Sequence, residues 1–496
     1  MSIFLIWRRI LVETPKDLVT SKIDSYIKKI NNFFYIQWTP ILCMALSLFL
    51  FFSMSYIILC NDTLTSFYQW YFHINIYGFY FYFGIDGISI LFMYLTSFFI
   101  PLCLLFNIKS LTHNTSEYSV SITAVGFLVL LVFSVLDLFL FYIFFEAILI
   151  PFFFMIGTSG SRVRKIHATY LLFFYTLVGS VLMLIAICLL TLHCGTSNIQ
   201  LLLNYTFQDL QDSFIWFCFA ISFSIKVPIF PFHIWLPEAH VEAPTEVSVL
   251  LAAILLKIGA YGFLRILFPL FPELSRYYSI FLISLNLISL LFSSLATFKQ
   301  YDIKRIIAYS SISHMNLAML GFLSFDGNAV IGSLLVMIGH GFISGGLFFM
   351  VGMLYLRFKT RFLIYYSGLV TIMPLWSTFF FFLILSNISF PGTINFIGEF
   401  LILSYILEKS TSIILLFFLS ALFLCTGYSI WLTNKLLFGV PSFQKYVTTY
   451  DLDFIELSIL FPIAVMVLFI GVHPMFLIDI VYMHILSSNV FTYFLL

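Results

Sequence analysis

Four ionisable residues lie inside long apolar stretches of this 496-residue sequence, where their side chains could carry protons or ions. They are two acids, Glu146 and Glu399, and two bases, Lys226 and Lys257. An ionisable group at bilayer depth costs at least about 2.5 kcal/mol. One such residue alone would be compatible with a structural ion pair. Two acids and two bases together favour a path for protons or ions.

Two of these charges adjoin predicted helix breaks. Pro228 follows Lys226 within two positions, and Pro391 precedes Glu399. Proline removes a backbone donor and breaks a helix, and irregular backbone is tolerated in a membrane only where it lines a cavity. Two interrupted spans about five spans apart predict an inverted repeat of five helices each. The alternative is a pair of ordinary proline kinks.

Further residues could bridge the charged sites. His240 and Glu242 follow the first predicted break, and His314 and His340 lie in later apolar spans. A neutral histidine takes up and releases protons near neutral pH. His314 alone would be better explained as a hydrogen-bonded core residue, but beside four buried charges these residues favour a relay.

Glu146 and Lys226 have opposite charges and could act as a gate. A carboxylate about 4 Å from an ammonium gains about 4 kcal/mol at an effective dielectric constant of about 20. Movement of Glu146 toward or away from Lys226 would therefore change whether the lysine holds its proton. This gate requires that the two helices meet.

The composition fixes the class of protein that positions these residues. The sequence is 62% hydrophobic and only 9% charged, whereas about a quarter of the residues of a soluble domain are charged. This excludes a soluble enzyme, a nucleic-acid binder and a disordered chain. Recurring runs of about 20 apolar residues predict an all-α polytopic membrane protein with about 13 to 14 transmembrane helices.

We expect five regions along the chain. They are a charged N-terminal extension on the membrane surface (1–35), N-terminal flanking helices (36–118), a first inverted repeat (119–264), a second inverted repeat (277–432), and a C-terminal flanking helix and tail (453–496).

The distribution of lysine and arginine predicts the orientation of the spans. If the N-terminus faces inward and the spans alternate, 18 cations lie on the inner side and three, Arg265, Arg276 and Lys409, on the outer side. The inner set comprises six residues within 1–35, Lys109, Arg162, Arg164, Lys165, Lys299, Lys304, Arg305, Arg357, Lys359, Arg361, Lys435 and Lys445.

The sequence carries no motif for a metal, cluster or nucleotide. None of the seven cysteines forms a C-x-x-C pair, and neither G-x-G-x-x-G nor a phosphate-binding loop is present. Any redox or ATP chemistry is therefore expected on another chain.

Several long motifs resemble the NADH dehydrogenase subunit 4 family, whose members are antiporter-like subunits of respiratory complex I. The resemblance runs from the G-I-D-G-I-S motif at 84–89 to the last span. It is carried by five segments: 141–151, YTLVGS at 175–180, HIWLPEAHVEAP at 233–244, LAAILLKIGAYG at 251–262 and DIKRIIAYSSISHMN at 302–316.

The resemblance implies fourteen transmembrane helices, two inverted five-helix repeats and a proton relay. The relay residues implied by motif are Glu146, Lys226, Lys257, His314, His340 and Glu399. Glu146 would gate Lys226, Lys257 would be the central relay, and Glu399 would exchange protons with the intermembrane space. One departure is that a single span, 38–60, precedes the G-I-D-G-I-S motif where the family has two.

The resemblance also implies a setting. FMN, iron–sulfur clusters and ubiquinone would reside on other subunits. The partners would be other membrane-arm subunits, especially the subunit 2-like and subunit 5-like antiporter chains, and lipids such as cardiolipin, with no nucleic acid. The location would be the mitochondrial inner membrane, with the N-terminus in the matrix. A subunit of a multi-chain cation/proton antiporter, which has the same fold and charges, is the alternative; a chain that only spaces its neighbours is a third.

Overall fold

The computed structural model describes residues 20–59, 70–76, 79–110, 115–160, 162–207, 210–409, 411–440 and 450–487. The N-terminal helices are α2 (Thr20–Leu59), α3 (Gly87–Ser110), α4 (Thr115–Ser134), α5 (Leu138–Ala147), α6 (Leu149–Ser159), α7 (Lys165–Cys194) and α8 (Ile199–Leu202). The central ones are α9 (Leu210–Lys226), α10 (Trp235–Glu242), α11 (Thr245–Leu250), α12 (Leu256–Gly262), α13 (Phe268–Leu270), α14 (Pro272–Tyr277), α15 (Ser279–Phe298), α16 (Ile303–Phe322) and α17 (Gly327–Phe358). The last are α18 (Leu369–Ile372), α19 (Pro374–Asn387), α20 (Ile394–Lys409), α21 (Ser412–Leu437), α22 (Phe454–Val472) and α23 (Met475–Ser487). Two π-helical segments, η1 (Leu251–Leu255) and η2 (Phe263–Leu267), flank α12, and η3 (Leu363–Tyr365) is a 3-10 turn.

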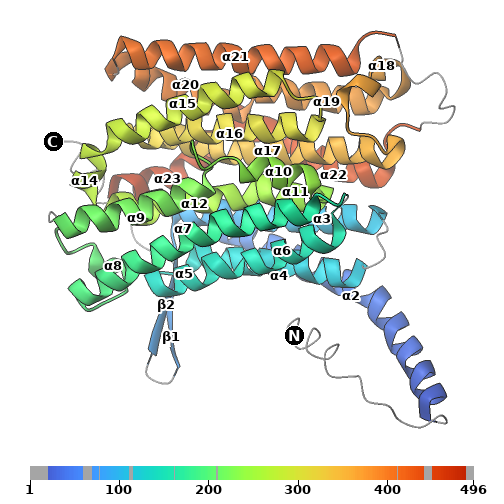
Figure 1. The fold of residues 1–496 in the computed structure, drawn as a ribbon, viewed down its shortest axis with the longest axis horizontal. Coiled ribbons are helices and arrows are strands. Elements are labelled where there is room, and N and C mark those ends of the chain that lie inside the picture. The colour runs from blue at the N-terminus through green and yellow to red at the C-terminus, as the bar shows by residue number, and fades with distance from the viewer. Residues whose placement is uncertain are drawn as a thin grey trace.

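The long helices lie side by side in one bundle (Figure 1). Ten helices of the described residues are long and apolar enough to cross a membrane, which confirms the all-α polytopic prediction. The predicted count of thirteen is higher because broken helices give short pieces, such as α9 and α19, and because α16 is rich in serine and contains His314 and Asn316.

Two spans form the centre of the bundle. Every residue is buried in an 18-residue apolar window of the span from Thr245 to Leu270 and in one of helix α17, whereas only 22% of such a window of α2 is buried. A fully buried helix must satisfy its polar side chains within the protein. The two central spans carry Lys257 and His340. The contacts of these two predicted relay residues are therefore made by other parts of the protein.

Both predicted breaks are present. Helix α9 ends at Lys226, and the chain turns before α10 begins at Trp235. The expected span 372–407 is divided into α19 and α20, with residues Ser389 and Gly392 in the left-handed region (φ 65° and 89°). The boundaries of the two inverted repeats, 119–264 and 277–432, remain predictions.

The N-terminal region differs from the expectation. Residues 1–19 of the predicted extension lie outside the described residues, and residues 20–35 continue as helix into the first span. No glycine or proline lies between Thr20 and Thr39 to interrupt this helix. The antiparallel hairpin of β1 (Trp70–Ile76) and β2 (Phe79–Ile85) was not predicted, although its aromatic and β-branched residues are typical of strands.

Cations predicted for one side of the membrane lie close together. The guanidinium of Arg162 is 5.4 Å from the centre of the Phe362 ring, and the backbone N–H of Ile303 donates to Arg361 O. We call the end of the bundle that contains Arg162 and Arg361 the inner end. The predicted outer cations Arg265 and Lys409 form ion pairs elsewhere, with Asp86 and Asp326. Which membrane face each end occupies remains a prediction.

Candidate functional site

Lys257 lies in α12, between the two π-helical segments, and its side chain is completely buried. A π-helical turn displaces backbone carbonyls from the regular α-helical pattern and is frequent at functional sites. The Lys257 ammonium donates a hydrogen bond to Ala252 O in η1, at 2.6 Å. The local irregularity therefore supplies an acceptor for a lysine in the apolar centre of the bundle.

The second contact of Lys257 is His340 on α17. The distance from Lys257 Nζ to His340 Nδ1 is 2.9 Å, and both side chains are buried. When the lysine is protonated it donates to Nδ1 of the neutral imidazole, and that tautomer carries its ring proton on Nε2. A proton can move across this bond to give a neutral amine and an imidazolium.

His314 and Glu399 extend this contact into a row. The ring centres of His340 and His314 are 5.9 Å apart, and His314 Nδ1 is 3.5 Å from Glu399 Oε1. The four residues come from α12, α17, α16 and α20. We call Lys257, His340, His314 and Glu399 the central polar row.

Glycines bring the helices of the row together. A Cβ atom on Gly398 would lie 2.6 Å from Gly332 O, so α20 and α17 touch through their backbones next to Glu399. Gly339 precedes His340, and a Cβ atom there would lie 2.2 Å from Asn395 Oδ1. Because the contact at Gly398 is with backbone, which cannot rotate away, any side chain at that position would push the two helices apart.

Lys226 lies at the break between α9 and α10 and is buried. Its ammonium donates to Phe145 O at 3.0 Å and lies 3.1 Å from the centre of the Phe145 ring. A cation over an aromatic face is stabilised by the ring quadrupole. Phe145 and Lys226 therefore bring α5 and α9 into direct contact, as the gate requires.

Glu146 follows Phe145 on α5 and interacts electrostatically with Lys226. Within the described residues, no ion pair of 4.0 Å or less joins the two charges. Glu146 Oε2 is buried and has no hydrogen-bond partner in the protein. The predicted pair is thus near but unformed in this structure, with Phe145 beside the ammonium.

The first break also packs against α12, the helix that carries Lys257 of the central polar row. A Cβ atom on Gly259 would lie 2.9 Å from Lys226 Cβ. Asn316, two residues from His314 on α16, donates to Pro228 O at 3.5 Å. In the described part of the chain, Lys226 and Lys257 share no hydrogen bond, so a proton would need an intermediate carrier between them.

His240 and Glu242 lie in α10, toward the inner end. The His240 ring stacks on Phe348 of α17 with ring centres 4.7 Å apart, and neither of its nitrogens has a hydrogen-bond partner in the protein. Glu242 is 4.0 Å from the guanidinium of Arg361. The two residues predicted to bridge the sites therefore face α17 and the inner-end cations.

Several buried charges were missed as site residues. The sequence places Lys304 and Arg361 in inner loops, but both are only 3% exposed. The reason is that Lys304 donates to Ala243 O and Arg361 to Val241 O, at the end of α10. The motif segment 233–244, which contains α10, indicated that this part of the chain matters. Apolar periodicity alone could not show that Lys304 and Arg361 would be buried against it.

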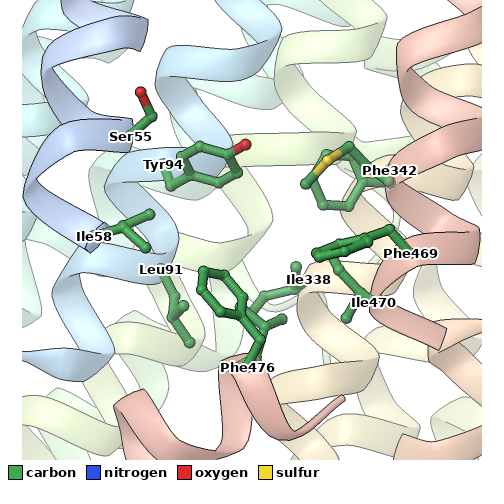
Figure 2. A pocket seen from close by; sticks show the side chains of 11 residues that line it. Ser55, Ile58, Leu91, Tyr94, Ile338, Phe342, Phe469, Ile470 and Phe476 are labelled. Atoms are coloured by element: carbon green, nitrogen blue, oxygen red, sulfur yellow. The ribbon is translucent and has the colours of Figure 1, made fainter. Parts of the chain in front are cut away.

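An apolar pocket of about 210 Å³ lies between α2, α3, α17, α22 and α23 (Figure 2). Phe342 contributes to its wall from α17, and Tyr94 from α3. None of the residues that line it belongs to the central polar row. This pocket is therefore separate from the row.

No group of three or more histidine, cysteine, aspartate or glutamate side chains that could hold a metal ion occurs among the described residues. The arrangement that the structure does contain, titratable side chains in sequence across a buried interior, is suited to proton transfer.

Comparisons with known proteins agree with this arrangement. The family model for the NADH:quinone oxidoreductase/Mrp antiporter transmembrane region matches residues 135–425. The NADH-ubiquinone oxidoreductase chain 4 of Arabidopsis thaliana is 47% identical over 411 residues, 82% of each chain. That of Chondrus crispus is 44% identical over 416 residues, 83% of this chain and 84% of the other.

Two solved structures have similar folds. A chain of respiratory complex I from Thermus thermophilus with bound NADH aligns over 91% of this chain and 98% of its own, with a TM-score of 0.80 and 27% identity. A chain of the Mrp complex from Dietzia sp. DQ12-45-1b aligns over 92% and 94%, with a TM-score of 0.81 and 16% identity. The latter likeness concerns the fold alone.

Proposed function

The chain belongs to the NADH:quinone oxidoreductase/Mrp antiporter transmembrane family, and we propose from this premise how protons cross it. Like its relatives named chain 4, it is a proton-translocating membrane-arm subunit of NADH:ubiquinone oxidoreductase, respiratory complex I. The proton carriers that we propose are Glu146, Lys226, Lys257, His340, His314 and Glu399. The observation that carries the proposal is the 2.9 Å contact between Lys257 and His340.

The proposed sequence of steps begins at the first break. A charge rearrangement elsewhere in the complex changes the distance between Glu146 and Lys226, and Lys226 then gives up its proton toward Lys257. Lys257, protonated in this way, passes a proton from its ammonium to His340 across their hydrogen bond and becomes a neutral amine. His314 connects His340 to Glu399, which releases the proton at the end of the row.

The energy for this movement comes from outside the chain. Moving one elementary charge against 100 mV costs about 2.3 kcal/mol. We place the redox groups of the enzyme, FMN, iron–sulfur clusters and ubiquinone, on other subunits, since the sequence contains none of the expected motifs. This chain then contributes proton transfer and no electron transfer.

We also propose the surroundings of the chain. Its neighbours are other subunits of complex I, among them the subunit 2-like and subunit 5-like antiporter chains, with lipids such as cardiolipin between them. The location is the mitochondrial inner membrane, with the N-terminus in the matrix. The excess of lysine and arginine on the inner side supports this orientation.

An antiporter subunit outside complex I is the competing assignment. The fold of the Mrp chain is compatible with it, but that chain is only 16% identical, whereas the relatives at 44–47% identity are named for the oxidoreductase. These relatives therefore favour complex I.

A native gel of digitonin-solubilised membranes, stained for NADH oxidation and followed by mass spectrometry, tests the assignment. We expect peptides of this chain in a band of about complex I size that oxidises NADH. Peptides confined to smaller bands without flavin would favour the antiporter. The relay is tested separately by Lys226→Ala, which should lower the number of protons pumped per electron in the assembled complex.

A further inference from the structure

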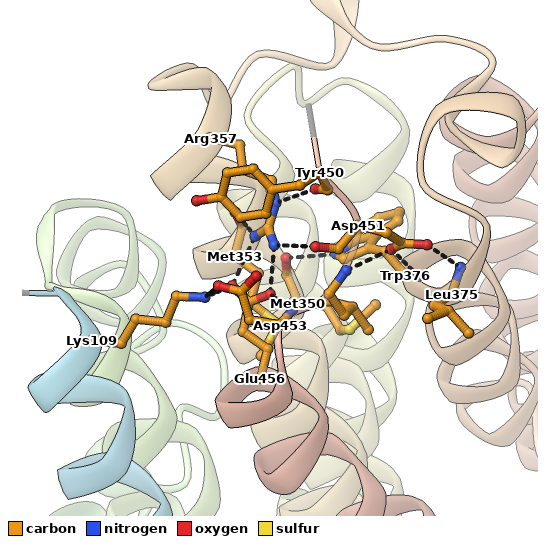
Figure 3. A network of polar contacts seen from close by, with 11 residues as sticks. Lys109, Met350, Met353, Arg357, Leu375, Trp376, Tyr450, Asp451, Asp453 and Glu456 are labelled. Carbon is orange, nitrogen blue, oxygen red and sulfur yellow. Dashed lines mark hydrogen bonds and ion pairs between the residues drawn. The ribbon is translucent and has the colours of Figure 1, made fainter. Parts of the chain in front are cut away.

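A group of charged residues at the inner end of the bundle has no part in the relay. Glu456, at the start of α22, is completely buried and accepts hydrogen bonds from Arg357 at 2.8 and 2.6 Å. Lys109, at the end of α3, lies 2.9 Å from Glu456 Oε1 and also contacts Asp453. Figure 3 shows Glu456 between the two cations.

We propose that Lys109, Arg357, Asp453 and Glu456 form a clamp that positions the two central relay helices, and thereby Lys257 and His340, for proton transfer. We call these four residues the end clamp. The inference rests on the proposed relay and adds positioning residues to it, none of which carries a proton.

The end clamp holds α17 at a defined position along its axis. Arg357 lies in the last turn of α17, and its guanidinium donates to Tyr450 O, Asp451 O and Met353 O in addition to Glu456. A planar guanidinium with this many fixed acceptors has one orientation. Because a helix is rigid along its axis, fixing Arg357 also fixes His340, about 25 Å away at 1.5 Å per residue.

The same end of α3 contacts the helix of Lys257. Ser110, which follows Lys109, donates to Glu246 Oε1 at 3.2 Å, and Glu246 lies in α11. Helix α11 continues through η1 into α12. Two adjacent residues of α3 are therefore linked to the two central spans. Lys109 is linked to α17 through Glu456, and Ser110 to the span of Lys257 through Glu246.

Packing along α3 agrees with this role. Cβ atoms on Gly341 and Gly345 of α17 would lie 2.9 Å from Leu95 and 2.6 Å from Phe99, both on α3. At the inner end, a Cβ atom on Gly352 would lie 2.4 Å from Thr245 of α11. Helices that fit together without spare space cannot shift relative to one another without clashes.

The first half of the second broken helix is attached to the same place. Asp451 accepts hydrogen bonds from the backbone N–H groups of Leu375 and Trp376, at the start of α19, at 2.6 and 3.0 Å. The Trp376 indole donates to Met350 O on α17. The end clamp thus lies where α3, α17, α19 and α22 converge, and Figure 3 shows these contacts as a continuous network.

The test compares assembled complexes that carry Glu456→Gln or Lys109→Met. Glutamine keeps the shape of Glu456 but removes its charge, and Lys109→Arg keeps the cation. At equal amounts of assembled complex, we expect the first two variants to translocate protons about tenfold more slowly and Lys109→Arg to be near wild type, since misplacement by ~1 Å can cost up to about 100-fold. Lys409→Met, at an exposed ion pair of 3.8 Å, is the control.

A role limited to folding would give a different result. If Glu456→Gln and Lys109→Met lower only the amount of complex, with normal translocation by the complex that remains, the end clamp does not position the relay. If Glu456→Gln fails to assemble, Lys109→Met decides by the same comparison.

A parallel Lys257→Met variant separates this inference from the relay itself. If Lys257→Met translocates protons normally, the proposed function is wrong. If Lys257→Met stops translocation while both clamp variants translocate normally, the relay stands and the clamp is rejected.

Discussion

The ammonium of Lys257 and Nδ1 of His340 are 2.9 Å apart, although 83 positions separate the two residues in the sequence. The contact joins the central helix of the predicted first repeat to α17 of the second. Both neighbours of His340 are glycines, Gly339 and Gly341, which allow α20 and α3 to pack against α17 at this level. The site thus depends on small residues as much as on charged ones.

Replacement of Lys257 by methionine should separate the chemistry of this contact from its packing. Methionine has a similar length and no charge, and because no ion pair of 4.0 Å or less among the described residues includes Lys257, the substitution leaves no opposite charge buried without its partner. We therefore expect the amount of assembled complex to be retained. Proton translocation should fall by about 100-fold or more, in line with the loss of a positioned proton carrier.

The measurement is proton uptake by membrane vesicles during NADH oxidation. Lys435→Met, on an exposed turn at the end of α21, is the matched control and should behave as wild type. Normal pumping by Lys257→Met would contradict the relay.

Much of this site could be predicted from residue type alone. An ionisable group in an apolar run is costly and therefore conspicuous, so the sequence indicated Lys257, Lys226, Glu146 and Glu399. Pro228 likewise indicated the first break, because proline interrupts helical hydrogen bonding.

Other features could not be read from local sequence. The π-helical segments on either side of Lys257 leave no mark in the apolar periodicity of the sequence. Burial of Lys304 and Arg361 depends on carbonyls of α10, which are distant in the sequence. The contact between Phe145 and Lys226 could not be predicted either, because the sequence showed neither the distance nor the rotation of α5 relative to α9.

Glu146 provides a test of the gate. Glu146→Gln removes the charge near Lys226 and keeps the size of the side chain, whereas Glu146→Asp keeps the charge on a shorter side chain. We expect Glu146→Gln to slow proton translocation about tenfold or more, since closing the gate to about 4 Å would bring a carboxylate–ammonium attraction of about 4 kcal/mol at an effective dielectric constant of ~20. Glu146→Asp should retain more activity. Equal activities of the two variants would show that the charge has no role.

Gly259 is the position where a single methyl group should disturb the first break. Its Cβ atom would lie 2.9 Å from both Lys226 Cβ and Val227 Cγ2, and 3.1 Å from Phe223 O. Overpacking of this kind costs about 1–3 kcal/mol. Gly259→Ala should therefore lower both the thermal stability of the complex and its proton translocation.

Gly157→Ala is the control for this substitution. Its Cβ atom would meet only Thr169 Cγ2, at 3.9 Å, which is an ordinary contact. Since alanine is favoured over glycine in a helix by about 0.5–1 kcal/mol, this variant should be as stable as wild type or slightly more stable. If both alanine variants behave alike, the close approach at Gly259 is not limiting.

The ion pair between Arg265 and Asp86 should matter for stability because it fixes the other end of the Lys257 helix. Arg265 lies in η2, its Nη1 is 2.7 Å from Asp86 Oδ2, and Asp86 is 6% exposed. Removing one member of a buried pair costs about 3–5 kcal/mol because the other charge remains. Arg265 is 17% exposed, so we expect a smaller loss of about 2 kcal/mol for Asp86→Asn. The double variant Asp86→Asn/Arg265→Gln should recover part of that loss, since it leaves no uncompensated charge. Thermal unfolding of the solubilised complex measures the effect, and strictly additive losses in the double variant would show that the two charges do not stabilise each other.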